Sequence, residues 1–167
     1  MTKRSNIQSE NIFYRNNLGI DFIPKEVFAH PKLEQLDLSY NSIIKLGEDI
    51  SKLVHLKHLD LSNNKLQSLP ESIVKLKHLE VLILSNNQLS SFPEIITKLT
   101  ELKVLKLKGN HIKTIPASIA QLYQLELLDL GFSPIRDLPS ELAQLPVLKE
   151  LICTSNHFSA FPEVLLE

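Results

Sequence analysis

The sequence predicts a right-handed α/β solenoid, a curved horseshoe with a parallel β-sheet on its concave face and 3₁₀ or short helical turns on its convex face. First, leucines recur at a strict interval of 23 residues, at Leu33, Leu56, Leu79, Leu102, Leu125 and Leu148. Second, each copy joins a short strand-like segment to a proline-headed segment with helical spacing. Third, the chain has 167 residues, 43% of them hydrophobic, which suits one packed domain. A fixed period of this length is the signature of stacked repeats.

The strand-like segment lies at positions 3–7 of each copy, when Leu33 is numbered position 1. In Gln35-Leu36-Asp37-Leu38-Ser39 the leucines alternate with polar residues. Because successive side chains of a strand point to opposite faces, the leucines are expected in the core. Each strand is expected to lie in parallel beside that of the preceding copy, about 4.8 Å away. The rest of the unit supplies the crossover that a parallel pair needs.

The crossover is expected to contain a short helical turn that begins at a proline. Position 15 is proline in five copies, at Pro70, Pro93, Pro116, Pro139 and Pro162. Proline fixes φ and suits the first turn of a helix. Ile73 and Leu76 are three residues apart and share a helical face. Because these turns are wider than the spacing between strands, we expect the sheet on the inside of the curve.

Position 9 is asparagine in most copies, at Asn41, Asn64, Asn87, Asn110 and Asn156. An asparagine side chain both donates and accepts hydrogen bonds, so such a column can pair the buried backbone groups of successive turns. Asn63-Asn64 and Asn86-Asn87 look like catalytic or glycan-binding pairs, but the recurrence favours a structural role for Asn64 and Asn87. Ser133-Pro134 breaks the column, which predicts a shifted turn that presents Phe132.

The unit L-x-x-L-x-L-x-x-N-x-L-x-x-L-P-x-x-I-x-x-L resembles the leucine-rich repeat, and it covers nearly the whole chain. Its 23-residue length and its Leu-Pro pair are similar to the intracellular subclass found in Ras-associated scaffold proteins and in short repeat proteins of pathogenic bacteria, spirochaetes among them. The chain departs from extracellular relatives with disulfide-bonded end caps, because Cys153 is the only cysteine.

The copies divide the chain into three parts. Residues 1–9 are expected to form an N-terminal tail, residues 10–32 a degenerate capping repeat, and residues 33–167 six 23-residue repeats, the last of them truncated. The strand near residues 151–154 would have an unpaired edge, which invites pairing with another chain. We expect either an end-to-end homodimer there or a minimal cap formed by Val164 and Leu165.

Charge and composition argue against several classes of function. The net charge is −1, with 18 basic and 19 acidic residues, which is unlike a nucleic-acid or anionic-membrane binder. No apolar run approaches the roughly 18 residues of a membrane-spanning helix. The N-terminus lacks a standard secretory signal. We therefore expect a cytoplasmic protein or one exported without such a signal.

The residues with catalytic or metal-binding chemistry are sparse. Cys153 replaces a core leucine at position 6, so it is interpreted as a small buried hydrophobe rather than a nucleophile. His55 and His58 are spaced as a ligand pair, but zinc needs three or four ligands. Asp37 and Asp60 lie on adjacent strands, where they could bind a cation, though a solvated acidic patch is the preferred interpretation. We expect no enzyme activity, no metal and no cofactor.

The outward-facing positions of the sheet vary from copy to copy, so they are the candidate recognition surface. The copies around Asp37 and Asp60 are polar and acidic, whereas those from Val81 onward are apolar. A contiguous apolar patch marks a binding site, although β-branched residues also simply suit strands. The candidate partner-binding residues are Tyr40, His58, Asp60, Val81, Ile83, Val104, Lys106, Leu127, Asp129, Phe132 and Ile152.

Charges alternate along position 2, at Glu34, Lys57, Glu80, Lys103, Glu126 and Lys149. Opposite charges on neighbouring strands stabilise by roughly 0.2–1 kcal/mol per pair. We interpret this ladder as support for register and solubility, not as a ligand site.

The favoured function is a non-enzymatic protein–protein interaction module that binds an unidentified protein through the concave sheet. One alternative is an exported bacterial virulence factor or effector that binds a host protein or glycan. A second alternative, by analogy with the family alone, is a regulator of a small GTPase.

Overall fold

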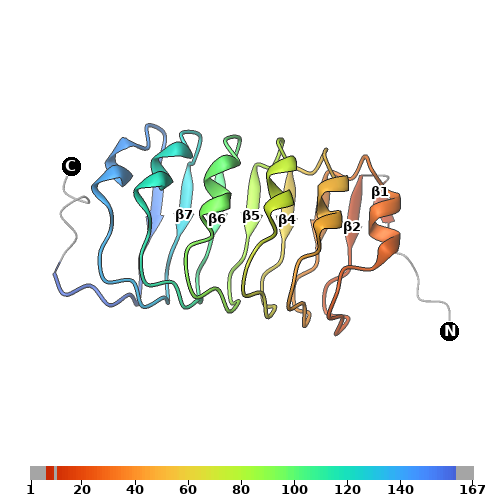
Figure 1. The fold of residues 1–167 in the computed structure, drawn as a ribbon, viewed down its shortest axis with the longest axis horizontal. Coiled ribbons are helices and arrows are strands. Elements are labelled where there is room, and N and C mark those ends of the chain that lie inside the picture. Colours follow the sequence, from red (N-terminus) through yellow and green to blue (C-terminus); the bar gives the residue numbers. More distant parts are fainter. Residues whose placement is uncertain (1–6, 10, 161–167) are drawn as a thin grey trace.

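The computed structural model describes residues 7–9 and 11–160, which form one solenoid (Figure 1). Its sheet has eight strands in sequence order: β1 (Ile7–Ser9), β2 (Ile12–Tyr14), β3 (Gln35–Asp37), β4 (His58–Asp60), β5 (Val81–Ile83), β6 (Val104–Lys106), β7 (Leu127–Asp129) and β8 (Glu150–Ile152). Five-residue 3₁₀ helices alternate with them: η1 (Lys25–Ala29), η2 (Glu48–Lys52), η3 (Glu71–Lys75), η4 (Glu94–Lys98), η5 (Ala117–Gln121) and η6 (Ser140–Gln144). Figure 1 shows these helices in a row on the side of the solenoid away from the strands.

The sheet from β2 to β8 is parallel, and its register follows the sequence period. Leu36 pairs with Leu59, Leu59 with Leu82, and Leu82 with Leu105, always 23 residues apart. Each strand covers only positions 3–5 of its copy, which is shorter than the expected positions 3–7. The predicted parallel sheet and 3₁₀ turns are confirmed.

The core is a continuous column of aliphatic side chains between the sheet and the helices. Leu36, Leu59, Leu82, Leu105 and Leu128, at the centre of successive strands, are all 0% exposed. Ile73 and Ile119, from the middle of η3 and η5, meet them from the other side and are also 0% exposed. Because no copy can bury both its faces alone, stacking of neighbours supplies the stability.

Proline starts most of the 3₁₀ helices as expected. In η3, Pro70 is the N-cap residue in extended conformation, and its carbonyl accepts the N–H of Ile73 at 3.1 Å. The N–H of Leu76 then bonds to the carbonyl of Ile73 at 3.0 Å, which closes the turn. Gly47 occupies the same cap position in η2.

The buried asparagines bridge neighbouring copies as predicted. The Asn64 Nδ2 donates to the carbonyls of Leu38 and Leu61, and its Oδ1 accepts the N–H of Ile43 at 2.9 Å. Asn64 is 7% exposed. Each asparagine of the column therefore ties its own turn to the preceding one through backbone groups that would otherwise be buried without partners.

The break at Ser133-Pro134 changes the hydrogen bonds but not the turn. Phe132 has a φ of 54°, close to the 55° of Tyr40 in a regular copy, so the predicted shift of the turn is wrong. The Ser133 Oγ and the Asn156 Oδ1 are nevertheless buried without a hydrogen-bond partner. The backbone geometry is kept because the Phe132 N–H still bonds to the carbonyl of Thr154 at 2.8 Å.

The two ends differ from the middle. Residues 7–9, expected in the tail, form β1, which pairs antiparallel with β2. In the degenerate repeat, Phe13, Ile23 and Val27 are buried, as a capping repeat requires. At the other end Leu148, Leu151 and Cys153 are only partly buried. The expected cap of Val164 and Leu165 lies outside the described residues.

Within residues 7–9 and 11–160, no helix has the length and apolar character needed to cross a membrane.

We predict that replacing asparagine by serine at position 9 lowers the free energy of unfolding, whereas replacing serine by asparagine there raises it. Asn64→Ser removes the bonds to Leu38 and Leu61 and should lower the free energy of unfolding by about 2–4 kcal/mol, because buried backbone groups lose partners. Ser133→Asn adds the missing carboxamide and should raise it by about 1 kcal/mol. Urea unfolding measures both. Changes of the same sign in the two variants would contradict the role of the column.

Candidate binding surface

The side of the sheet that faces away from the core, called the concave face here, presents positions 3 and 5 of β2 to β8. Its side chains are half-buried rather than fully exposed in the middle of the sheet, as at His58, Val81, Val104 and Lys106. They stand on strands whose inward leucines are 0% exposed, so the surface is held by a rigid core.

Four apolar side chains form a continuous strip on this face. Val81, Val104 and Leu127 are direct neighbours on β5, β6 and β7. Ile83 lies two residues beyond Val81 on the same face of β5. We call Val81, Ile83, Val104 and Leu127 the apolar strip. Its members come from three copies of the repeat, so only the stacking brings them together.

Ile152 does not belong to the strip. In the row of position 5, Lys106 and Asp129 lie between Ile83 and Ile152. The apolar patch is therefore smaller than predicted, because it does not extend to Ile152.

Asp129, expected as an exposed partner-binding residue, is instead 8% exposed. Its Oδ1 accepts the N–H of Gly131 at 3.0 Å. Asp37 and Asp60 make the same bond to the N–H groups of Ser39 and Ser62, both at 2.8 Å. An aspartate at position 5 thus holds the turn that follows its strand. The strand pattern did not predict this role, because it gives only the face of the sheet on which the side chain lies.

The acidic end of the concave face consists of Asp37 and Asp60, which are direct neighbours on β3 and β4. The Asp37 Oδ2 accepts a bond from Asn16 Nδ2 at 3.3 Å. Within the described part of the chain, no group of three or more metal-ligating side chains gathers here or elsewhere. Two adjacent carboxylates repel each other, so they destabilise the sheet slightly.

The basic end consists of Lys106, on β6, and Lys108, just beyond it. Lys108 Nζ lies 4.8 Å from the centre of the Phe132 ring. Lys108 was not predicted as a site residue. The signal was present, since position 7 is serine in three preceding copies, at Ser39, Ser62 and Ser85.

Tyr40 and Phe132 have an unfavourable backbone conformation and large exposed side chains. Both occupy position 8, where every copy has a positive φ, with Asn17, Asn63 and Asn86 at 53–56° and Gly109 at 70°. Asparagine and glycine tolerate this left-handed region, whereas an aromatic residue there is an outlier. Tyr40 is 62% exposed and Phe132 53% exposed, so neither is held there by burial.

The row of position 8 holds a glycine at Gly109. The Asn86 Nδ2 donates to the Asn63 Oδ1 at 2.9 Å, which links two neighbouring copies. A Cβ at Gly109 would clash with the carboxamide of Asn86, so this side chain leans over the glycine and fills the space beside it. The glycine therefore makes room for Asn86.

The charges of position 2 form separate pairs rather than a continuous ladder. Lys57, Lys103 and Lys149 each bind the glutamate of the preceding copy, with Nζ–Oε2 distances of 3.0, 2.8 and 2.6 Å. The hydrogen bond to Glu80 raises the pKa of Lys103, and the one from Lys149 lowers the pKa of Glu126. Each pair joins two copies, which agrees with a role in register.

Cys153 is a poor nucleophile. It is half-buried at position 6, and burial, followed by the nearby charge of Asp129, raises the pKa of its thiol to about 11. Since the thiolate is the reactive form, this environment suppresses its chemistry at neutral pH.

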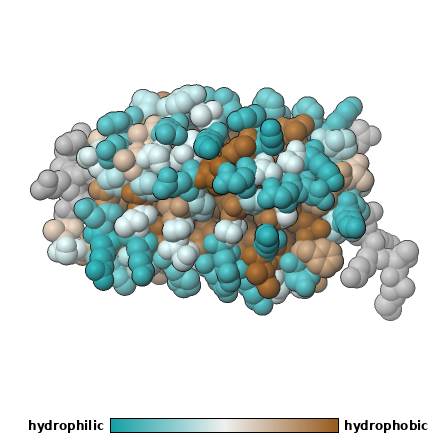
Figure 2. Space-filling model, viewed as in Figure 1, coloured by the Kyte–Doolittle hydropathy of each residue, from teal (hydrophilic) through white to brown (hydrophobic). Residues whose placement is uncertain are grey.

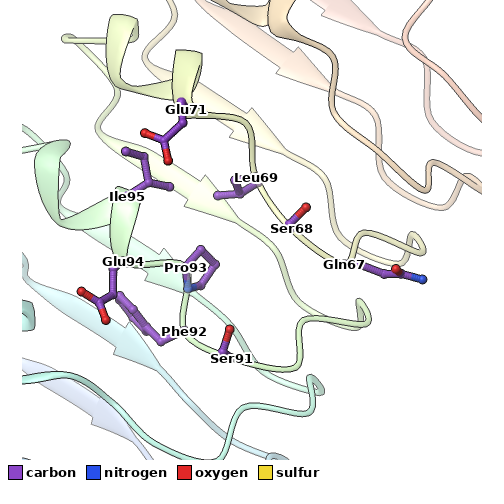
Figure 3. Close-up of a pocket in the computed structure, with 9 residues that line it drawn as sticks. All are labelled: Gln67, Ser68, Leu69, Glu71, Ser91, Phe92, Pro93, Glu94 and Ile95. Carbon is purple, nitrogen blue, oxygen red and sulfur yellow. The ribbon is translucent and has the colours of Figure 1, made fainter.

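The convex side carries a shallow pocket between the segments that lead into η3 and η4 (Figure 3). Its volume is about 360 Å³. Leu69, Phe92 and Ile95 form its apolar wall, and Glu71 and Glu94 stand at its border. The two glutamates are exposed, so the pocket offers no buried charged group to hold a ligand.

Two large, exposed apolar residues outside the sheet were also not predicted as site residues. Phe22 is 64% exposed and Ile44 53% exposed. Ile44 takes position 12, where later copies have Gln67, Ser90 and Lys113, and that contrast was the available signal. Figure 2, in the orientation of Figure 1, shows apolar side chains between the polar ones mainly in the half nearer the N-terminus.

A family model described as a leucine-rich repeat region matches residues 32–107. The chain is a leucine-rich repeat protein. No curated protein matches the sequence. The similarity to solved structures extends over most of the chain, so the repeat continues on both sides of the matched residues.

Three solved structures illustrate this similarity. The ectodomain of the receptor kinase GASSHO1/SCHENGEN3 from Arabidopsis thaliana, in complex with CASPARIAN STRIP INTEGRITY FACTOR 2, is 32% identical, with a TM-score of 0.75 over 86% of this leucine-rich repeat protein. The Arabidopsis receptor kinase HAESA, in complex with the peptide hormone IDA and the co-receptor SERK1, is 30% identical, with a TM-score of 0.77 over 89%. A leucine-rich repeat protein of Leptospira interrogans is 27% identical, with a TM-score of 0.65 over 92%.

The leucine-rich repeat protein is much shorter than these neighbours. It spans 18% of the GASSHO1 chain, 26% of the HAESA chain and 51% of the Leptospira chain. Plant and bacterial proteins thus share its repeat geometry within longer chains.

We predict that Tyr40→Asn stabilises the protein by up to about 1 kcal/mol, because asparagine adopts the left-handed conformation at lower cost. Phe132→Asn should gain less, since it also loses the contact with Lys108. Thermal and urea unfolding measure both changes. A clear loss of stability in Tyr40→Asn would show that the aromatic ring contributes to the fold.

We also predict slow alkylation of Cys153. A rise of the thiol pKa from 9.0 to about 11 lowers the thiolate fraction at pH 8 about 100-fold. Iodoacetamide labelling followed by mass spectrometry measures the rate, with the urea-unfolded chain as the control. Equal rates in the folded and unfolded chains would contradict the buried environment.

Proposed function

We propose that this leucine-rich repeat protein is a non-enzymatic module that binds another protein through its concave face. The observation that carries the proposal is the apolar strip, in which Val81, Val104 and Leu127 are in register on three adjacent strands and remain partly exposed. An apolar surface that continues across several strands marks an interaction site on a soluble domain.

Strand propensity alone does not account for the strip. The same positions of β3 and β4 hold Gln35 and His58, which form equally regular strands. Leu127 is not β-branched, so it has no special preference for a strand. The apolar residues are therefore confined to one part of a sheet that folds with polar residues elsewhere.

The aromatic residues at position 8 support the same surface. Tyr40 follows β3, two strands before the strip, and Phe132 follows β7, the last strand of the strip; asparagine would suit the backbone better at both positions. A strained backbone that carries an exposed aromatic side chain points to a function outside folding. Tyrosine and other rigid aromatic anchors often dominate binding energy.

The structural neighbours support the kind of function but not a particular partner. GASSHO1 was solved with CASPARIAN STRIP INTEGRITY FACTOR 2, and HAESA with the peptide hormone IDA and a co-receptor. The leucine-rich repeat is typically a protein-binding scaffold, and this chain offers the same geometry over a shorter length.

We predict that Ile83→Lys combined with Leu127→Lys abolishes capture of the partner but leaves the fold intact. Both side chains are partly exposed on the strip, so a charge there is tolerated in the free protein and buried without a counter-charge in a complex. The measurement is a pull-down from candidate host and bacterial lysates, followed by binding of each captured, purified protein to the wild type and the variant.

The matched control is Ile44→Lys combined with Val54→Lys, which adds the same charges at residues 53% and 42% exposed outside the concave face. This control should bind like the wild type, and circular dichroism should be unchanged in both variants. Binding that survives the change of Ile83 and Leu127 would refute the concave-face assignment.

A further inference from the structure

We propose that the concave face selects an extended polypeptide segment with charges of opposite sign at its two ends. A basic side chain of the segment lies over Asp37 and Asp60, an apolar side chain lies over Ile83 of the strip, and an acidic side chain lies beside Lys106 and Lys108. This inference rests on the proposed function and specifies the chemistry of the partner.

The acidic end keeps its charge although the charge is unfavourable for the sheet. Asp37 and Asp60 are direct neighbours, and each uses Oδ1 to hold the N–H two residues ahead. An asparagine would supply the same acceptor without the repulsion. The nearby Arg15 does not neutralise the pair, because its guanidinium lies 4.5 Å above the Phe13 ring. The carboxylates of this end are therefore available to a cation from outside.

The basic end lies two strands from Asp60, with Ile83 of the apolar strip between Asp60 and Lys106 in the row of position 5. Among the described residues, the position-2 lysines of the sheet are paired with glutamates, whereas no carboxylate lies within 4.0 Å of Lys106 or Lys108. Asp129 is the neighbour of Lys106 on β7, but it is buried and holds the N–H of Gly131. Glu150 is exposed one strand further, on β8. The two ammonium groups remain as the local positive charge.

The spacing of these groups fits an extended chain. Asp60 and Lys106 are separated by two strand intervals, or about 10 Å, which corresponds to about three residues of extended polypeptide. Tyr40 and Phe132 are separated by four copies of the repeat, or about 19 Å, which corresponds to about six residues. The segment therefore needs about six residues between its two aromatic contacts.

The rim carries side chains that suit a polypeptide backbone. The carboxamides of Asn63 and Asn86 lie next to each other there, and that of Asn86 covers Gly109. Carboxamides both donate and accept hydrogen bonds, as the peptide groups of an extended chain require.

The test uses a phage-displayed library of random twelve-residue peptides, selected on the full-length wild-type protein. The expected peptides combine a basic and an acidic residue on either side of apolar residues. Binding of synthetic copies should fall about three- to tenfold in Asp37→Asn/Asp60→Asn and in Lys106→Gln/Lys108→Gln, because each variant removes charge but keeps the side-chain shape. Raising the salt from about 0.1 M to about 1 M should weaken the wild type more than either variant.

The control is Glu48→Gln/Glu71→Gln, which removes two charges from the convex side and should leave peptide affinity unchanged. If the selected peptides lose binding in Ile83→Lys/Leu127→Lys but not in the charge variants, the bipolar partner is refuted and the concave binding site stands. If every selected peptide still binds Ile83→Lys/Leu127→Lys, the extended-segment inference is refuted. The proposed function is tested separately by the pull-down.

Discussion

The structure depends on one constraint, the pairing of each copy with the next at an offset of exactly one repeat. Buried asparagines impose this offset, because a carboxamide such as that of Asn87 reaches the carbonyl of Leu61 in the preceding copy and that of Leu84 in its own. A slip of one residue would turn the inward leucines toward water. The column therefore protects both the hydrogen bonds and the hydrophobic core.

This constraint separates the positions that serve the fold from those free to vary. Inward leucines, position-9 asparagines and the prolines that start 3₁₀ helices repeat because each copy must match its neighbours. Even some outward residues belong to this group, as Asp129 shows by holding the N–H of Gly131. The remaining outward positions vary from copy to copy, and position 8 also varies, although Gly109 there leaves room for Asn86. The apolar strip, the lysine pair and the two exposed aromatic residues all lie there.

Tyr40 and Phe132 illustrate a conflict between folding and the proposed binding role. The backbone at position 8 has a positive φ in every copy, and asparagine or glycine meets that demand in several of them. Aromatic side chains raise the cost of the turn, while their exposure adds apolar surface on the same rim of the sheet. Such local departures from the best-folding residue are expected where a protein contacts a partner.

Much of the proposed binding surface was also visible in the sequence, because the period assigns outward residues to neighbouring strands. It placed Val81, Val104 and Leu127 side by side, and the register confirms this. The period did not predict the features in which a side chain can adopt another rotamer or contact the adjacent copy. The burial of Asp129, the contact of Lys108 with Phe132 and the unshifted turn at Ser133-Pro134 depend on rotamers and on backbone groups of the adjacent copy.

The amino-acid order alone is enough to predict the repeat, the parallel sheet, the 3₁₀ turns and the identity of the core, because hydrophobic period and proline placement act within each copy. The pairwise grouping of the position-2 charges and the β1 strand within the expected tail emerge only in the folded molecule. These features arise from distances between copies, and a one-dimensional pattern does not contain the side-chain geometry that sets them.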